Sequence, residues 1–439
     1  MPGHTSRRQM LWTLLFVWIA ALAMSACGQS PAAPAPTTAP AAPTTAPAAP
    51  APTTAPAAPA PTTAPAAPQG APIKVGCSLP LTGAFADTGI WVERGYRQWA
   101  EDVNAAGGLL GRPVELIIYD DESKTENAVN LLTRAITVDQ VDLLCGGYPG
   151  TAAAAQMAVA EKNQMVYVSM GGHMASFSQG FTYVFGAPPL MGQWWYEGLY
   201  GWLATLPEAE RPKKAAIFTI NNPVGGAILE PMPEKLKALG IEIVVNERYD
   251  VPLTDAAPLV TKAKAAEADI FFANGFFPDS VQIVKAMRAL DYNPKLIAQG
   301  VGSIIPAWVQ ELGTDGYYVF SGTAVHPSLP FEGISRLNDV AKAKYEAPVA
   351  PIYFIFGYAW MQALQRGVEG AQSLDQTAIR DWLKSNQMTT VAGTFTFDER
   401  GLPPPYNYLT QVIDGKVELI WPPEVRTKDP IYPKPAWGK

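Results

Sequence analysis

The chain has 439 residues and a formal net charge of −7, from 32 Lys and Arg against 39 Asp and Glu. It has no basic run beyond its first ten residues, which argues against nucleic acid as a partner because that binding needs clustered Lys and Arg. Three cysteines are too few for a disulfide scaffold, three histidines without a His/Cys cluster argue against a metal site, and we expect no cofactor.

The N-terminal segment predicts export. A basic start precedes an apolar stretch over residues 11–24, which is shorter than the about 20 residues of a membrane-spanning helix and therefore fits a signal peptide. Two small residues then precede Cys27, an order that resembles a bacterial lipoprotein signal with lipid attached to this cysteine. A plain secretory signal is the alternative, and Arg7-Arg8 leaves the choice between general and twin-arginine export open.

Residues 28–72 predict a disordered linker. This segment has no charged residue and repeats the unit APTTAPAAP. It offers only small apolar side chains, and Pro blocks both helix and central strand. We expect polyproline II at about 3.1 Å per residue, a spacer on the order of 100 Å; a tail without a spacing role is the alternative. Residues 1–26 are thus the predicted signal peptide, and residues 27–72 the lipidated cysteine and linker.

From residue 73 onward, short apolar runs alternate with segments of helical spacing. The strands expected in the first half are residues 73–80, 114–121, 141–147 and 165–172, and the helices are residues 90–106, 126–137 and 152–162. Strands that alternate with helices of about 10–15 residues predict parallel sheets with right-handed crossovers.

The second half repeats this alternation. Its expected strands are residues 214–220, 241–250, 268–275, 295–302 and 316–324, and its expected helices are residues 227–239, 257–267 and 280–290. Pro231 and Pro233 should kink or shorten the first of these helices. Two such runs joined near residues 193–212 predict two α/β lobes.

The end of the chain adds further elements. Residues 353–365 and 374–385 are expected helices, and a hairpin-like pair over residues 394–401 and 407–420 carries Asp414-Gly415 as its turn. Extra elements after two α/β runs indicate that the chain crosses back between the lobes. The predicted parts are residues 73–192 plus 324–392 for the first lobe, residues 193–323 plus 393–425 for the second, and a C-terminal tail over residues 426–439.

Three stretches, residues 80–89, 104–123 and 268–293, resemble periplasmic solute-binding proteins of the leucine/isoleucine/valine type. The resemblance extends over about residues 73–420 and implies the type I periplasmic-binding-protein fold, an α/β architecture of two doubly wound parallel-sheet lobes joined by three crossovers. Such proteins close over a small ligand and serve ATP-driven importers. The family also includes amide-sensing regulators and ligand domains of signalling receptors.

The ligand site is expected beyond the carboxyl ends of the strands. The loops there are rich in Gly and small polar residues: residues 81–89, 146–152, 169–178, 221–226, 274–279 and 299–303. Gly150 and Thr151 open a helix whose N-terminus favours an anion, so we expect them to receive a carboxylate or similar oxygen group. A simple N-cap role for Thr151 is equally consistent with the sequence.

The departures from the family pattern bear on the ligand. The acidic residue with which amino-acid binders of this family recognise an ammonium group corresponds to Gly300, with Gln299 beside it. A buried cation needs a paired charge, so we expect a carboxylate or amide with an apolar or aromatic body rather than necessarily an α-amino acid.

Other family positions complete the expected site. His173 stands where the family has a small hydroxyl residue, Val224 replaces an aromatic, and Phe276 and Tyr353 match aromatic positions. The ligand-binding residues predicted in full are Thr88, Tyr148, Gly150, Thr151, Gly171, His173, Val224, Phe276, Gln299 and Tyr353.

Several of these residues and their neighbours have a purely structural alternative. His173 is alternatively a surface or self-satisfied histidine, and Phe276 packs under the lobe interface as readily as it stacks on a ligand. The aromatic residues within 194–202 are expected mostly in the core or between lobes. Cys77 and Cys145 end two strands of the first lobe and either form a disulfide in an oxidising compartment or remain buried thiols.

The sequence favours a receptor over an enzyme. It contains no G-x-S-x-G, no G-x-x-x-x-G-K-[ST], no H-E-x-x-H and no G-x-G-x-x-G after a strand. We expect an extracytoplasmic, lipid-anchored and monomeric solute receptor that delivers ligand to the permease and ATPase of an importer. A ligand-sensing subunit for a membrane signalling protein is the alternative. The sequence does not specify the ligand or its affinity.

Overall fold

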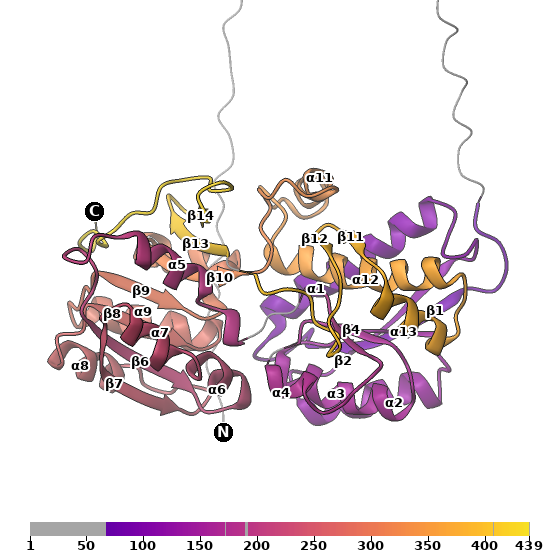
Figure 1. The fold of residues 1–439 in the computed structure, drawn as a ribbon, viewed down its shortest axis with the longest axis horizontal. Helices are drawn as coiled ribbons and strands as arrows, with labels where there is room; N and C mark the ends of the chain where they lie inside the picture. Colours follow the sequence, from indigo (N-terminus) through magenta and orange to yellow (C-terminus); the bar gives the residue numbers. More distant parts are fainter. Residues whose placement is uncertain (1–66, 172, 189–191, 407, 439) are drawn as a thin grey trace, which may run out of the picture. The chain divides into compact units, whose positions relative to one another are not determined.

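The computed structural model describes residues 67–171, 173–188, 192–406 and 408–438. These residues form the two α/β lobes that the sequence predicts (Figure 1). The predicted signal peptide, Cys27 and nearly all of the predicted linker lie outside the described residues. Within the described ranges, no helix combines the length and apolar character that crossing a membrane requires.

The first lobe contains a five-stranded sheet in the order β2-β1-β3-β4-β5, with every pairing parallel. Its strands are β1 (Ile73–Leu79), β2 (Val114–Asp120), β3 (Leu143–Cys145), β4 (Tyr167–Ser169) and β5 (Val184–Gly186). The four predicted strands are all present, and β5 adds a fifth. β5 is as short as β3 and β4, but it follows the four-residue α4 and so departs from the alternation of strands with helices of about 10–15 residues.

Helices cover both faces of this sheet (Figure 1). The helices are α1 (Ala86–Ala105), α2 (Thr125–Thr137), α3 (Gly150–Lys162), α4 (Met174–Phe177), α11 (Ile334–Tyr345), α12 (Ile352–Ala371) and α13 (Gln376–Ser385). Buried side chains of α1 and α12 pack into one apolar cluster, and those of α2 and α3 into another. Strands buried on both faces explain the continuous apolar runs of the sequence.

Two glycines allow α1 and α12 to pack closely. A methyl group on Gly95 would lie 2.5 Å from the Phe354 oxygen, and one on Gly357 would lie 2.4 Å from the Val92 oxygen. Both distances are shorter than van der Waals contact, so only glycine permits this backbone approach.

A disulfide between Cys77 and Cys145 joins β1 to β3, with 5.1 Å between their Cα atoms. The sequence left this bond and a pair of free thiols as alternatives, and the structure has the bond. Both residues are almost fully buried. The bond lies near the carboxyl ends of β1 and β3, just before the loops that begin at Pro80 and Gly146.

The second lobe contains a seven-stranded sheet in the order β14-β13-β10-β9-β8-β6-β7. Its strands are β6 (Lys214–Ile220), β7 (Glu242–Tyr249), β8 (Ile270–Asn274), β9 (Leu296–Gln299), β10 (Val319–Thr323), β13 (Tyr408–Ile413) and β14 (Lys416–Trp421). The predicted Asp414-Gly415 turn is confirmed, because it joins the antiparallel β13 and β14 and both residues have positive φ angles, 50° and 76°.

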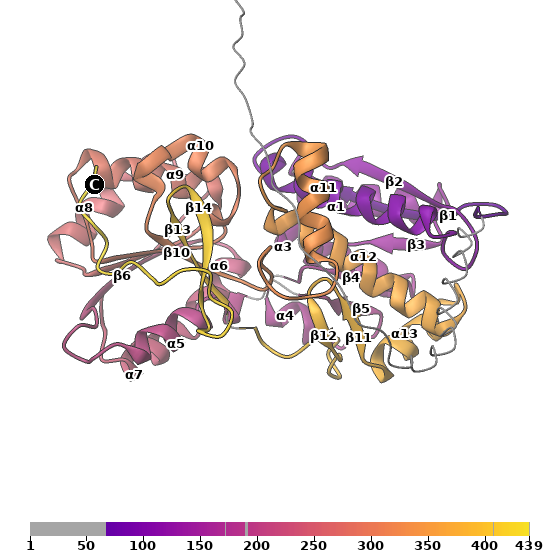
Figure 2. The same cartoon turned by 90° about the horizontal axis from the view of Figure 1, so that it is seen from above.

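Helices also cover both faces of the second sheet (Figures 1 and 2). They are η1 (Gly192–Trp194), α5 (Glu197–Thr205), α6 (Pro223–Leu229), α7 (Met232–Ala238), α8 (Ala257–Ala265), α9 (Phe277–Ala289), η2 (Gly302–Ile304), α10 (Ala307–Leu312) and η3 (Gly313–Gly316). The single helix expected over residues 227–239 is wrong: α6 ends at Leu229 and α7 begins at Met232. Pro231, which has no N–H to donate, separates them.

The chain passes between the lobes after β5, after β10 and after β12, which confirms the three predicted crossovers. The last crossing lies later than expected. The expected pairing of residues 394–401 with residues 407–420 is wrong, because β12 (Gly393–Phe395) pairs with β11 (Met388–Thr390). The Gly401 oxygen accepts a hydrogen bond from the Gly186 N–H. The first lobe therefore extends past residue 392, where the sequence placed its end.

The C-terminal residues pack on the second sheet. The Gln411 side chain of β13 bonds both the N–H and the oxygen of Ile431, at 2.8 and 2.9 Å. The Lys434 N–H donates to the Lys295 oxygen beside β9 at 2.8 Å. These bonds attach the predicted tail to the second lobe.

Candidate functional site

A small cavity lies at the carboxyl ends of the strands, where the loops of both sheets meet. The first lobe contributes Tyr148, Pro149, Gly150 and Met170 to its wall, and the second lobe contributes Trp195, Val224, Ile228, Phe276 and Val301. Its volume is about 30 Å³, whereas a pocket that holds an organic ligand measures roughly 300–1,000 Å³. The cavity in this conformation therefore has room for little more than water.

Aromatic rings connect the two sides of this cavity. The Phe85 ring of the first lobe lies 4.8 Å from Phe276 of the second and 6.3 Å from Tyr148, both edge to face. Tyr148 in turn lies 5.4 Å from the buried Tyr353 ring. Phe85 falls within the predicted loop over residues 81–89, but it was not among the predicted ligand-binding residues.

The N-terminus of α3 faces the cavity through Gly150. Pro149 is the N-cap, and no side chain caps this helix. The first hydrogen bond of the helix runs from Ala153 N–H to the Pro149 oxygen at 2.9 Å, so the preceding N–H groups have no intrahelical acceptor. Together with the helix dipole, they favour a negatively charged group. The N-cap alternative for Thr151 is wrong, because Thr151 lies inside the first turn.

A buried hydrogen-bond chain holds the loop that precedes α3. Gly147 N–H donates to the Tyr167 hydroxyl at 2.7 Å, and that hydroxyl donates to Gln156 Oε1 at 2.6 Å. Gln156 Nε2 donates to Ser78 Oγ at 2.9 Å, and Ser78 Oγ donates to Asp121 Oδ2 at 3.2 Å. We call these five residues the first-lobe polar chain. Because each link is paired, the loop leading to Tyr148 and Gly150 is fixed in position.

Asp121 ends this chain as a buried carboxyl group. Burial raises the pKa of Asp121 to about 6, although hydrogen bonds from Ser123 and Ser78 act in the opposite direction. The described residues contain no group of three or more His, Cys, Asp or Glu side chains that could hold a metal ion. Asp121 thus serves the loop geometry at this sheet edge.

An acidic side chain at position 300 would require the neighbouring backbone to shift. A methyl group on Gly300 would lie 2.7 Å from the Gly275 oxygen and 3.2 Å from its nitrogen. Among the described residues, those that line the cavity carry no charge. The wall therefore offers no carboxylate to pair with an ammonium group.

Trp195 is a cavity residue that the sequence did not identify. Its ring nitrogen donates to the Gln299 oxygen at 3.2 Å, and its side chain lines the cavity. Trp195, Tyr196 and Trp202 are all buried in the largest apolar cluster, which confirms the predicted packing role of this aromatic segment. Trp195 lies in the turn between η1 and α5, and the sequence gave no signal that it would also reach the cavity.

The predicted residues divide into three groups. Those that line the cavity are Tyr148, Gly150, Val224 and Phe276. Those next to lining residues, in sequence or in space, are Thr88, Thr151, Gly171, Gln299 and Tyr353. His173 belongs to neither group: it precedes α4 and its ring lies 3.1 Å from Ser176 Oγ, in agreement with the self-satisfied alternative.

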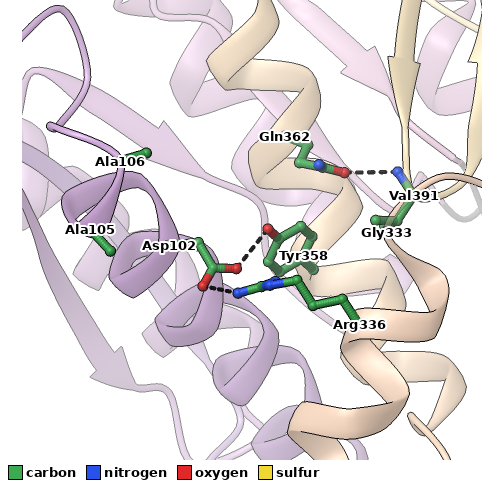
Figure 3. A pocket seen from close by; sticks show the side chains of 8 residues that line it. All are labelled: Asp102, Ala105, Ala106, Gly333, Arg336, Tyr358, Gln362 and Val391. Carbon is green, nitrogen blue, oxygen red and sulfur yellow. Dashed lines mark hydrogen bonds and ion pairs between the residues drawn. The ribbon is translucent and has the colours of Figure 1, made fainter. Parts of the chain in front are cut away.

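A larger hollow of about 450 Å³ lies elsewhere, between α1, α11 and α12 of the first lobe (Figure 3). Asp102 pairs there with Arg336 and accepts a hydrogen bond from the Tyr358 hydroxyl at 2.8 Å. Gln362 Oε1 accepts from Val391 N–H at 2.8 Å. These polar groups satisfy one another and lie away from the strand ends, so the hollow is a weaker candidate than the small cavity.

Comparison with known proteins consistently finds solute-binding proteins. A family model described as periplasmic binding protein matches residues 72–416. An "Amino acid binding protein" of Pseudomonas aeruginosa is 24% identical over 336 residues, which span 75% of this chain and 87% of the relative.

Two solved structures have similar folds. The branched-chain amino acid transporter substrate-binding protein of Streptococcus pneumoniae, in complex with isoleucine, has a TM-score of 0.71 and 22% identity over 80% of this chain and 100% of its own. A solute-binding protein of an ABC transporter from R. palustris, in complex with benzoate, has a TM-score of 0.70 and 18% identity over 80% of this chain and 95% of its own. At these identities the likeness concerns the fold.

Proposed function

The chain belongs to the periplasmic binding protein family, and from this premise we propose that it is the solute receptor of an ATP-driven importer. The family is described as periplasmic binding protein, and the two solved structures are a substrate-binding protein and a solute-binding protein of transporters. The receptor would close its lobes over ligand and present the closed form to a membrane permease.

We propose that the ligand is a small organic acid with an apolar or aromatic body. The observation that carries this proposal is the cavity wall, which combines the uncapped N-terminus of α3 at Gly150 with uncharged, mainly apolar side chains. The helix N-terminus suits a carboxylate, and Phe276 and Trp195 suit the body of the ligand. The benzoate-bound relative of the same fold is consistent with such a ligand.

Lobe motion is part of the proposed function. A ligand the size of benzoate or leucine exceeds the about 30 Å³ cavity, so its entry requires Phe85 and Phe276 to separate. Such hinge closure is a usual way for two-lobed proteins to enclose ligand. X-ray scattering with and without a bound acid should therefore give different curves, and superimposable curves would contradict lobe closure.

The ligand class can be tested directly by calorimetry and native mass spectrometry on protein purified without denaturation. We expect aromatic acids to bind and Gly150→Asp to weaken that binding at least about tenfold, because its carboxylate repels the ligand's. Because Gly150 is buried, the melting temperature of the ligand-free variant must first show that it folds. Gly226→Ala is the control, since the nearest atom to its new methyl is 3.7 Å away. Micromolar binding of leucine or valine without binding of aromatic acids would contradict this class.

We also propose that Cys27 anchors the protein to the membrane. The support is the sequence alone: an apolar stretch, two small residues and then Cys27, followed by the uncharged linker over residues 28–72. Cys27→Ala should release the protein from the membrane fraction, with Ser30→Ala as the control because it leaves both Cys27 and the Cys77–Cys145 disulfide intact. Membrane association that survives Cys27→Ala would contradict the anchor.

A further inference from the structure

Three buried polar side chains of the second lobe have no hydrogen-bond partner. They are Gln299, through both Oε1 and Nε2, and Ser280 and Ser303, each through Oγ. All three residues are at most 1% exposed. Burying a polar group without a partner costs about 1–3 kcal/mol, and proteins rarely leave such groups unpaired. We call these residues the second-lobe polar cluster.

Strand and helix periodicity bring Gln299 and Ser280 onto facing surfaces. Gln299 lies two residues after Ile297 on β9, hence on the same face of the sheet. Ser280 lies four residues before Val284 on α9, hence on the same stripe of the helix. Ile297 and Val284 belong to one apolar cluster, so both polar side chains face the space between β9 and α9.

Ser303 lies at the same end of this space. It belongs to η2, which directly follows β9. A methyl group on the neighbouring Gly302 would lie 2.9 Å from Ser280 Oγ, so η2 packs against the first turns of α9. All three residues therefore lie where β9 ends and α9 begins.

This place adjoins the wall of the cavity. Val301, between Gln299 and Ser303, lines the cavity, and so does Phe276, the N-cap of α9. The Gln299 oxygen accepts the hydrogen bond from Trp195, a third lining residue. A ligand group that reaches past Val301 and Phe276 would meet the polar cluster.

The cluster suits an uncharged group. Asp279 is the acid next to Ser280, but its Oδ1 already accepts a hydrogen bond from Leu253 N–H at 2.9 Å. Among the described residues Lys434 is the one buried cation, and it donates to Asn293 at 2.7 Å. An amide and two hydroxyls supply both donors and acceptors without net charge. A hydroxyl group, which donates and accepts, is complementary to that set.

We propose that Gln299, Ser280 and Ser303 form a subsite for a hydroxyl group of the ligand, so that the protein selects hydroxy acids over the matching amino acids and unsubstituted acids. This inference rests on the proposed function. An analogue without the hydroxyl leaves the cluster unpaired, which is how sites built for a hydroxyl reject its absence. An ammonium group would enter without a counter-charge.

Calorimetry on two matched sets of probes tests this subsite. The sets are 4-hydroxybenzoate against benzoate, and 2-hydroxy-4-methylpentanoate against leucine and 4-methylpentanoate. For at least one set we expect the hydroxy acid to bind about tenfold or more tightly than its analogues. Gln299→Met should abolish this preference by weakening the hydroxy acid alone, and Ser280→Ala should reduce it.

The control is Gln98→Met, because Gln98 is also buried with an unpaired Oε1 but lies on α1. It should leave the preference unchanged, and melting temperatures should show that all variants fold. Binding without a preference for the hydroxy acid, or a preference that survives Gln299→Met, overturns the subsite and leaves the proposed function standing. If no probe binds, native mass spectrometry decides: a co-purified solute without a hydroxyl group overturns the subsite alone, and the lack of any bound acid overturns both proposals.

Discussion

Each lobe holds a set of buried polar groups behind the cavity wall, and the two sets differ in their hydrogen bonding. In the first lobe, the polar chain from Gly147 to Asp121 has a partner at every link. In the second lobe, Gln299, Ser280 and Ser303 have none. A fully paired buried network rigidifies its surroundings, whereas an unpaired group is costly until something binds it.

This difference suggests a division of labour. The first lobe holds the N-terminus of α3 in a fixed position, ready for a carboxylate. The second lobe leaves polar groups unpaired, so a ligand that pairs them gains free energy only when the lobes enclose it. Closure would then depend on the identity of the ligand, since a poor ligand leaves the second-lobe polar cluster unpaired.

Removal of the disulfide should have the largest effect on the stability of one lobe relative to the other. Cys77 and Cys145, separated by 68 positions, tie two strands of the first lobe, and the second lobe contains no cysteine. A loop of this length implies a loss of about 4 kcal/mol of unfolding free energy for Cys77→Ala/Cys145→Ala. Urea unfolding measures the total, and hydrogen exchange resolved by peptide should locate the loss in the first lobe.

A matched control distinguishes the bond from packing. Cys77→Ser/Cys145→Ser in oxidising buffer should behave like the wild-type protein under reducing conditions, apart from the cost of two buried hydroxyls. Equal loss of protection in both lobes would show that they unfold as one unit and would contradict an independent role for the first lobe.

The pH dependence of stability should contain two opposed contributions. Burial raises the pKa of Asp121 in the first lobe to about 6, so the folded state binds its proton more tightly and unfolding free energy falls as pH rises from about 4 to 6. Burial lowers the pKa of His326 to about 4. This histidine follows β10 and bonds the Val417 oxygen at 2.9 Å. It must stay neutral, so its contribution rises as pH rises from about 4 to 6.5.

Each contribution to the unfolding free energy is on the order of 3 kcal/mol, and the two have opposite signs. The net change in unfolding free energy between pH 4 and 6 is therefore small. Asp121→Asn leaves the contribution of His326, so its unfolding free energy should increase as pH rises. His326→Gln leaves the contribution of Asp121, so its unfolding free energy should decrease as pH rises. Urea unfolding at half-unit steps of pH measures both slopes. Parallel profiles for the two variants would contradict the assignment.

Much of the fold could be predicted because its strands are buried on both faces and its helices lie between them. Apolar runs such as residues 214–220 mark a parallel strand by themselves. The errors have local causes. β5 follows a helix of only four residues, α4, and so departs from the expected alternation. The pairing of β12 with β11 depends on a contact that no local pattern encodes.

The sequence could predict only those site residues that lie in loops at the carboxyl ends of the strands. Tyr148, Gly150, Val224 and Phe276 follow from loops at the carboxyl edges. Trp195 was missed because it lies in the turn between η1 and α5, where no periodicity indicates which way its side chain points. Whether a polar side chain such as Ser280 finds a partner is likewise set by neighbours far away in the sequence, so the unpaired state of the second-lobe polar cluster is visible only in the structure.

Two buried tyrosines provide the finest test of the contrast between the lobes. Tyr167→Phe in the first lobe leaves Gly147 N–H and Gln156 Oε1 without a partner, and we expect a loss of about 1–3 kcal/mol of unfolding free energy. Tyr249→Phe in the second lobe removes a buried hydroxyl that has no partner. It should change stability by less than about 0.5 kcal/mol or increase it, because the same group is deleted without breaking a bond. Urea unfolding of the ligand-free protein at one pH compares the two variants directly. Equal losses would mean that ring packing rather than hydrogen bonding sets the cost, and the contrast between the paired first-lobe polar chain and unpaired groups of the second lobe would then have no energetic basis.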